Sequence, residues 1–403
     1  MSNLALLRLI LLLSAITTCC CAVFSRKDMD ATVPQIIASN GYPIEKHRVK
    51  TEDGYILQMH RIPAGKRSAR RSNTYGGKGK RAVLIVHGLL GSSGDFVIMG
   101  PRNSLSYILA DAGYDVWLGN LRGNMYTTHQ NLTRNDPAFW DYSFHEHGKY
   151  DAPAMIDKVL NVTGLSKIFY IGYSMGTTTF FTMMSQKPEY NDKLIAFVAL
   201  APAVYIDNMK EISVFFLKSM DIATTLRQRG MLAVGLKQDI MDLVAENFCT
   251  AKNPDQDVCM RFIYAIVGED YEQHNWDMTP IIIARAQPAS WRQLEHYGKI
   301  AMTSVFTEWD DGMEGAVKPY KLSNVRVPVS ILYGENDLLV EKSGILRLAK
   351  SLNETGVLHS IKPGCNWPKF NHLDFVFAKD LGKLVNRPLV RHLDELYNKY
   401  YQQ

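Results

Sequence analysis

Short, uninterrupted apolar runs alternate along this chain with stretches that have helical spacing. Ala82-Val83-Leu84-Ile85-Val86 is the clearest of these runs, and it contains no polar residue. Such a run is typical of a strand buried on both faces, as in a parallel sheet covered by helices. Comparable strand-like runs recur at 114–118, 168–171, 195–200 and 327–333, and helix-like stretches at 104–112, 150–162 and 175–185. The alternation predicts an α/β fold with a mostly parallel central sheet and helices on both faces.

The pattern changes between about residues 205 and 320. Strand-like runs become scarce there, and helix-like stretches rich in methionine, leucine and isoleucine dominate. Because the strand pattern resumes at 327–333, we interpret this block as a helical cap or lid inserted into the sheet domain; an independent helical domain is the alternative. The sequence predicts a signal segment at 1–22, a first core part at 23–204, the cap at 205–320 and a second core part at 321–403.

The first 22 residues have the layout of a secretory signal. Arg8 is followed by an apolar run at 9–16, and the segment ends in Cys20-Cys21-Ala22. A membrane anchor and a simple amphipathic start are the alternatives, but the run is shorter than the about 20 residues that cross a bilayer, and no other run is long enough. We therefore expect a protein of the secretory pathway, extracellular or lysosomal, with no transmembrane segment.

Cleavage of this segment leaves Cys249, Cys259 and Cys365. Cys249 and Cys259 are close in sequence and are expected to form a disulfide in an oxidising compartment, which leaves Cys365 as a buried or free thiol. Three sequons fit the same compartment and predict glycosylation at Asn131, Asn161 and Asn353.

The formal net charge of +5 arises from one local segment. Residues 65–81 hold a cluster of basic residues and no acidic one: Lys66, Arg67, Arg70, Arg71, Lys78, Lys80 and Arg81. A nucleic-acid-binding protein carries its positive charge on a folded face, whereas this segment is typical of a solvated loop, so we expect no nucleic-acid partner. Attraction to anionic lipid is the alternative role. An apolar content of 46% with 21% charged residues supports a large buried core.

The motif Gly172-Tyr173-Ser174-Met175-Gly176 lies between a predicted strand and a predicted helix. In that context G-x-S-x-G forms a sharp turn that exposes the serine hydroxyl above the sheet, with glycines where side chains cannot fit. The motif also arises by chance, and an ordinary serine in a strand-to-helix loop is the alternative. Its place directly after the strand at 168–171 favours Ser174 as a nucleophile.

A serine nucleophile needs a base, and the base needs an orienting carboxylate; in this fold the order along the chain is serine, acid, histidine. His359 lies inside a strand pattern and His392 in a charged terminal helix, where it is expected to be solvated. His372 falls in the loop after the last strand and is the predicted base. Asp337 is the predicted acid because it leaves the carboxyl end of the returning strand; Glu335 is its rival. Surface or local capping roles are expected for Asp310, Asp311 and Asp374.

Two backbone N–H groups must be positioned to donate hydrogen bonds to the oxyanion that forms during attack. Met175, directly after the nucleophile, is predicted to supply one, and Leu89, in the loop after Ala82–Val86, the other. His87 lies too early in the chain to be the base and is expected to be loop scaffold. His145-Glu146-His147 resembles part of a metal site, but no third ligand accompanies it at helical spacing, so no metal and no cofactor are expected.

On these residues the chain resembles the animal acid lipase family, the gastric and lysosomal acid lipases, and most of all its insect members. The similarity runs from about residue 34 to 378, and its most specific stretches are Gly41-Tyr42-Pro43, Thr51-Glu52-Asp53-Gly54-Tyr55-Ile56-Leu57, His87-Gly88-Leu89-Leu90, residues 112–120, Lys149-Tyr150-Asp151, Asn336-Asp337-Leu338-Leu339 and Asn371-His372-Leu373-Asp374-Phe375. The resemblance implies an α/β-hydrolase core with a helical cap and lid. It also implies the Cys249–Cys259 bridge and the same five site residues: Ser174, Asp337, His372, Leu89 and Met175.

Three departures from the family stand out. Mammalian members usually have glutamine where this chain has Met175, the basic segment 65–81 is longer than usual, and the cap is the least similar region. Since the cap shapes the substrate site, the preferred acyl chain and head group do not carry over.

The family hydrolyses triacylglycerols, cholesteryl esters or related lipid esters. The resemblance therefore implies a serine lipase that acts through an acyl-enzyme on neutral lipid esters, with transient lipid-surface contact through the cap. A soluble short-chain carboxylesterase with the same fold is one alternative, and a catalytically inactive lipid-binding homologue is the other. The intact set of Ser174, Asp337 and His372 favours an enzyme.

Overall fold

The computed structural model describes residues 30–66, 80–206, 256–309 and 315–401, together with residues 225, 233 and 249. The predicted signal at 1–22, most of the basic segment 65–81, much of the first half of the predicted cap, and Asp310 and Asp311 lie outside the described residues. No helix in the described ranges is long and apolar enough to cross a membrane.

In this part of the chain, nine strands form one sheet with the order β1-β2-β4-β3-β6-β7-β8-β9, and β5 pairs with β2. The strands are β1 (Glu45–Lys50), β2 (Tyr55–Ile62), β3 (Ala82–Val86), β4 (Asp115–Leu118), β5 (Thr127–His129), β6 (Ile168–Tyr173), β7 (Leu194–Leu200), β8 (Val329–Tyr333) and β9 (Leu358–Pro363). Every pairing from β4 to β9 is parallel, while β1, β2 and β5 add antiparallel pairs. The predicted mostly parallel sheet is confirmed.

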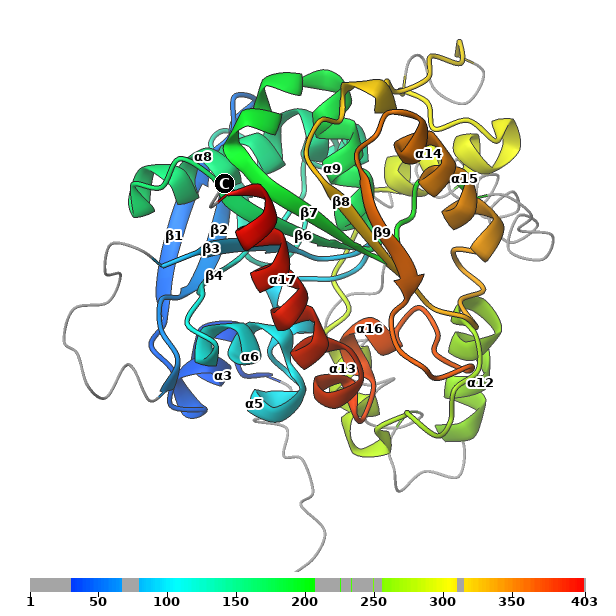
Figure 1. Ribbon diagram of the computed structural model, residues 1–403. Coiled ribbons are helices and arrows are strands. Elements are labelled where there is room, and N and C mark those ends of the chain that lie inside the picture. The colour runs from blue at the N-terminus through cyan, green and yellow to red at the C-terminus, as the bar shows by residue number, and fades with distance from the viewer. Residues whose placement is uncertain are drawn as a thin grey trace, which may run out of the picture.

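Helices cover both faces of the sheet, as the alternation predicts. One apolar core joins the sheet to α8 (Ala152–Thr163), α9 (Met175–Gln186) and α15 (Lys342–Glu354). A second core, on the other face, joins it to α3 (Val33–Ser39), α6 (Leu105–Asp111) and α17 (Arg387–Tyr400), which crosses the sheet in Figure 1. Each fully buried large apolar side chain stabilises the fold by about 1.5–3 kcal/mol. The remaining α-helices are α5 (Gly100–Asn103), α7 (Phe144–Glu146), α12 (Gln256–Val267), α13 (Thr279–Ala284), α14 (Trp291–Thr303) and α16 (Asp374–Phe377).

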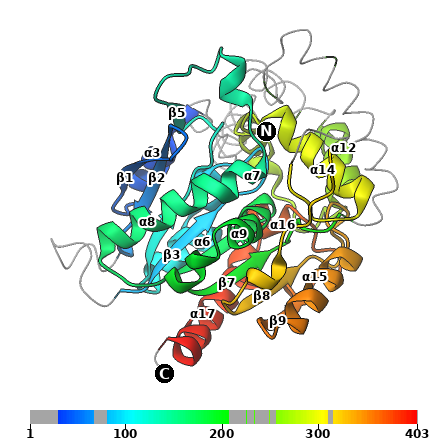
Figure 2. The same cartoon turned by 90° about the horizontal axis from the view of Figure 1, so that it is seen from above.

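Between β7 and β8 the described residues contain the helices α12, α13 and α14 and no strand of the sheet. Both views place α12 and α14 on the side of the molecule opposite to β1 (Figures 1 and 2). The helix α14 begins at a capping box formed by Ser290 and Gln293. Its Tyr297 and Ile300 belong to the same apolar core as α9, and the Tyr297 hydroxyl lies 2.9 Å from that of Thr178. The helix α14 is therefore part of the packed body of the protein.

A buried arginine ties together the loop after β4 and two distant segments. Arg122 donates from Nε and Nη2 to Asp151 at 2.9 and 2.7 Å, and from Nη1 to Asp53 at 2.6 Å. Its backbone N–H donates to the other oxygen of Asp151 at 3.0 Å, and its guanidinium lies 4.0 Å from the ring centre of Tyr55. With the Arg122 and Asp151 side chains almost fully buried, these charge-assisted hydrogen bonds hold the loop against both distant segments.

The expectation that His392 is solvated is wrong. His392 is 6% exposed, and its Nε2 lies 2.8 Å from the Ser330 hydroxyl on β8. The terminal helix is charged on its outer face only, and His392 lies on the face that α17 packs against the sheet, together with Leu389 and Leu393. The helical period, rather than the overall composition, decides the burial of this side chain.

Candidate active site

Ser174 occupies the sharp turn between β6 and α9. Its backbone has φ 51° and ψ −119°, a left-handed conformation that costs a non-glycine residue about 1–3 kcal/mol and persists only where the surroundings impose it. Its N–H donates to Leu200 O on β7 at 2.9 Å, which ties the turn to the sheet. This turn conformation places the hydroxyl of Ser174 above the carboxyl ends of the strands.

The two glycines of the motif are required by contact. A Cβ on Gly172 would lie 2.7 Å from the backbone of Gly176, and a Cβ on Gly176 would lie 2.3 Å from Val86 O. Both distances are far below van der Waals contact, and both obstacles are backbone atoms that cannot turn away. The helix α9 can therefore start this close to β3 and β6 only with glycine at both positions.

The side chains of Ser174, His372 and Asp337 lie in contact. His372 Nδ1 lies 2.7 Å from Asp337 Oδ2, and His372 Nε2 lies 2.8 Å from Ser174 Oγ. An ionised carboxylate only accepts hydrogen bonds, so Nδ1 carries the proton and Nε2 accepts from the serine hydroxyl. The second oxygen of Asp337 accepts the N–H groups of Leu339 and Val340 at 2.9 and 2.8 Å, which holds the carboxylate in place. The side chains of all three predicted residues are therefore buried and joined by hydrogen bonds.

Glu335 and His359, the other candidates for the acid and the base, pair with other side chains. Glu335 is exposed, and its carboxylate pairs with Lys342 at 3.0 Å rather than with His372. His359 lies on β9, as predicted, and its Nδ1 lies 2.9 Å from the Tyr400 hydroxyl. Neither side chain contacts Ser174 or His372 through any hydrogen bond among the described residues.

The two predicted oxyanion donors flank the nucleophile. Met175 is the first residue of α9, so its N–H has no acceptor one turn earlier in the helix. Leu89 lies in the loop after β3, and across the described ranges its N–H donates to no other group. The backbones of the two loops lie close together: a Cβ on Gly88, the residue before Leu89, would lie 3.0 Å from Ser174 Cβ. Among the described residues neither N–H group donates a hydrogen bond, as a pair of oxyanion donors requires.

His87 holds the loop that carries Leu89. Its Nδ1 donates to Gly88 O at 2.8 Å, and its Nε2 accepts the N–H of Leu121 at 3.1 Å. One nitrogen donates and the other accepts, so the ring is neutral, and burial lowers the pKa of His87 to about 4. The C=O of Gly88 and the N–H of Leu89 belong to one planar peptide and point in opposite directions, so holding the oxygen directs the donor. These contacts agree with the predicted scaffold role.

A buried pair of carboxyl groups lies next to the turn that carries His372, and the sequence indicates only a surface or local capping role for Asp374, one of the two. Asp374 does cap its turn, since it accepts the N–H of Asn371 at 2.7 Å, but it is buried and hydrogen-bonded to the carboxyl of Asp270. Asp270 also accepts the indole N–H of Trp367 at 2.7 Å. Burial, with Asp270 as a further cause, raises the pKa of Asp374 to about 8, so the pair holds one shared proton near neutral pH.

This shared proton predicts a pH-dependent stability. In the unfolded chain the carboxyl of Asp374 ionises near its ordinary pKa of 3.8, whereas in the folded protein it stays protonated up to about pH 8. The contribution of the protonated Asp374 carboxyl to the free energy of unfolding is therefore complete below pH 3.8. It declines as pH rises to about 8, at up to about 1.4 kcal/mol per pH unit. We expect the stability advantage of the wild type over Asp374→Asn, measured by urea unfolding, to shrink steadily from pH 4 to pH 8. A difference that stays constant over this range would contradict the shared proton.

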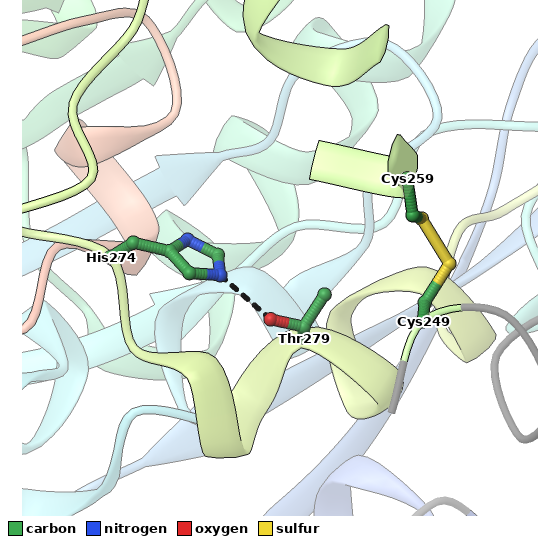
Figure 3. Close-up of a disulfide and its surroundings, with 4 residues drawn as sticks. All are labelled: Cys249, Cys259, His274 and Thr279. Carbon is green, nitrogen blue, oxygen red and sulfur yellow. Dashed lines mark hydrogen bonds between the residues drawn. A yellow bond between two sulfur atoms is a disulfide. The ribbon is translucent and has the colours of Figure 1, made fainter. Parts of the chain in front are cut away.

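The remaining predicted site residues have clear positions. The disulfide between Cys249 and Cys259 is present at the start of α12, near the His274–Thr279 hydrogen bond (Figure 3). Cys365 is a free, half-buried thiol. His145 Nδ1 lies 2.7 Å from the Tyr320 hydroxyl, and the Glu146 carboxylate accepts the N–H of Ser143, the N-cap of α7, at 2.6 Å. No group of three potential metal ligands occurs among the residues that the structure describes.

All three sequon asparagines are exposed: Asn131, Asn161 and Asn353.

Comparison with known proteins agrees with this architecture. Residues 81–372 match the family described as "alpha/beta hydrolase fold", and residues 33–100 match a "partial alpha/beta-hydrolase lipase region". A solved structure from Sulfolobus solfataricus shares the fold with a TM-score of 0.56 at 17% identity, over 87% of this chain and 93% of that one. The chain therefore belongs to the α/β-hydrolase fold family.

Its relatives within that family are animal lipases. "Lipase 1" of Drosophila melanogaster is 35% identical, over 92% of this chain and 81% of its own length. "Gastric triacylglycerol lipase" of Bos taurus is 34% identical, over 90% of this chain and 91% of its own length. The resemblance to animal lipases that the motifs indicated is confirmed, and the chain is an ester-hydrolysing enzyme of this group.

Proposed function

We propose that this protein hydrolyses the carboxylic ester bonds of neutral lipids, triacylglycerols or cholesteryl esters, through an acyl-enzyme on Ser174. The observation that carries this proposal is the imidazole of His372, in contact with Ser174 Oγ on one side and Asp337 on the other. With Leu89 and Met175 as oxyanion donors, the site has every group that ester hydrolysis by a serine nucleophile needs.

In the proposed reaction Ser174 Oγ attacks the ester carbonyl carbon while its proton passes to His372 Nε2. Asp337 stabilises the imidazolium, and the N–H groups of Leu89 and Met175 bind the carbonyl oxygen as it becomes an oxyanion. The tetrahedral intermediate collapses, His372 gives its proton to the departing alcohol, and the acyl group stays on Ser174. Water then attacks the acyl-enzyme while His372 Nε2 takes its proton, and His372 returns this proton to Ser174 Oγ as the second tetrahedral intermediate collapses and the fatty acid leaves.

The relatives of this chain support a lipid substrate. They are named as lipases, and one of them is a gastric triacylglycerol lipase.

We also propose that the cap at 205–320 includes a lid over the site and contacts a lipid surface transiently. Apolar side chains on loops around the site are exposed, as surface contact requires: Leu90, Met125 and Leu338.

A substrate panel tests this proposal. We expect turnover of triolein or cholesteryl oleate to exceed that of the corresponding butyrate esters, and activity per molecule to rise when the substrate passes from monomers to aggregates. Rates are measured by titration of released acid, with Ser174→Ala as the blank. Hydrolysis of short soluble esters alone would instead identify a carboxylesterase, and no rise on aggregated substrate would exclude the lid.

We propose a location in the secretory pathway, extracellular or lysosomal. The Cys249–Cys259 disulfide needs an oxidising compartment, and the exposed sequon asparagines are accessible to glycosylation. Expression in insect cells followed by glycosidase treatment would reveal whether the sequons carry glycans.

A further inference from the structure

The loop that carries Leu89 is held from two sides. His87 holds Gly88 O from the side of the sheet, as described above. From the other side, the backbone N–H of Gln287 donates to Leu90 O at 2.8 Å. Two carbonyl groups around Leu89 are therefore held by hydrogen bonds. One is that of Gly88, which shares a peptide with the N–H of Leu89, and the other is that of Leu90, the next residue.

Leu90 needs this second restraint. Its φ is 59°, a left-handed conformation that a leucine leaves unless its surroundings prevent it. The side chain of Leu90 is 40% exposed, so packing contributes little to holding the residue. The hydrogen bond from Gln287 is the contact that fixes the Leu90 carbonyl on the outer side of the loop.

Gln287 is itself held by its side-chain amide. It is 4% exposed and lies in the connection between α13 and α14, directly before Pro288, which favours an extended backbone at Gln287. Its Oε1 accepts the N–H of Met125 at 3.0 Å, and its Nε2 donates to Arg285 O at 2.8 Å. Met125 belongs to the same loop as Leu121, which holds His87. The side-chain amide of Gln287 thus joins the connection before α14 to the loop that contains Leu121 and Met125, while its backbone N–H joins that connection to Leu90.

We propose that Gln287 is a positioning residue for ester hydrolysis: by holding Leu90 it keeps the N–H of Leu89 directed at the oxyanion. This proposal rests on the proposed function, because it assumes that Leu89 is an oxyanion donor. A donor must lie about 2.7–3.1 Å from the oxyanion, and a misplacement of about 1 Å can cost about 100-fold in rate. The connection between α13 and α14 thereby positions an oxyanion donor without contacting the substrate.

The test is Gln287→Met, which keeps the length of the side chain and removes both amide hydrogen bonds. Active sites are first counted by complete reaction with a fluorophosphonate, so that misfolded protein does not contribute. For p-nitrophenyl butyrate we expect kcat per titrated site to fall roughly 10- to 100-fold with KM within about twofold of the wild type. The Ki of a trifluoromethyl ketone, whose adduct carries the oxyanion, should rise by the same factor as kcat/KM falls.

Gln273→Met is the matched control. Gln273 is 5% exposed, and its Oε1 accepts the N–H of Asp380 at 3.1 Å, so it also links two segments through a buried amide. It has no contact with the Leu89 loop among its described hydrogen bonds. We expect its kcat per titrated site to stay within about twofold of the wild type. Equal losses in the two variants, or wild-type kcat and Ki in Gln287→Met, would overturn the positioning role.

Gln287→Glu provides a second variant should the methionine variant not fold. Its carboxylate can still accept from Met125 but cannot donate to Arg285 O until it is protonated. The ratio of its kcat to that of the wild type should therefore rise as pH falls, and a ratio of one at every pH would overturn the proposal. If the fluorophosphonate does not label Ser174 in the wild type, the proposed function itself fails; normal labelling with unaffected Gln287 variants refutes only the role of Gln287.

Discussion

Replacing Ser174 with alanine is expected to lower kcat/KM for ester substrates by at least about 10⁴-fold. The change removes one oxygen atom, whose hydrogen bond partner is His372 Nε2 at 2.8 Å. Without this oxygen no acyl-enzyme forms, and only the oxyanion donors and substrate binding remain to accelerate hydrolysis. The melting temperature should stay close to that of the wild type, because the strained turn is fixed by Gly172, Gly176 and the backbone bond to Leu200.

Ser93→Ala is the matched control for this prediction. Ser93 is also buried, and its hydroxyl also lies 2.8 Å from a histidine nitrogen, Nδ1 of His60. Its loss removes an equivalent hydrogen bond away from the proposed nucleophile, so kcat/KM should change by no more than a few-fold. A Ser174→Ala protein with more than about 1% of wild-type activity would contradict the nucleophile assignment.

Replacing Arg122 with methionine is expected to destabilise the protein by about 3–5 kcal/mol. Methionine retains part of the apolar stem but leaves the fully buried carboxylate of Asp151 without its cation, and it also removes the pair with Asp53. An uncompensated charge in a buried site costs far more than the ion pair contributed. The free energy of unfolding in urea at pH 7 measures the effect.

Lys187→Met is the comparison for the arginine variant. Lys187 pairs with Glu52 at 2.7 Å, a distance like those made by Arg122, but Glu52 is 70% exposed. Solvent screens this pair, so its loss should cost no more than about 1 kcal/mol. Similar losses in the two variants would mean that burial does not decide the energy of these ion pairs.

Much of the site could be predicted because its chemistry depends on local pattern and chain order. The run Ala82–Val86 contains only apolar residues, and β3 has these bounds. The apolar run predicts that the returning strand starts at residue 327, whereas β8 starts at Val329, because Pro328 has no N–H to donate to the sheet. Ser174 was recognisable from the glycines around it, and His372 from its place after the last strand.

Other features depend on contacts between residues far apart in the chain, and no local pattern indicates them. The three-residue strand β5 is too short to have a period and exists because it pairs with β2. The strand–helix alternation, the glycine spacing around Ser174 and the order of the reactive residues are local properties, so they can be read from the amino-acid order. The proton shared by Asp270 and Asp374, the burial of His392 and the hydrogen bond from Gln287 to Leu90 arise only when the folded chain brings these groups within hydrogen-bonding distance or packs them out of water.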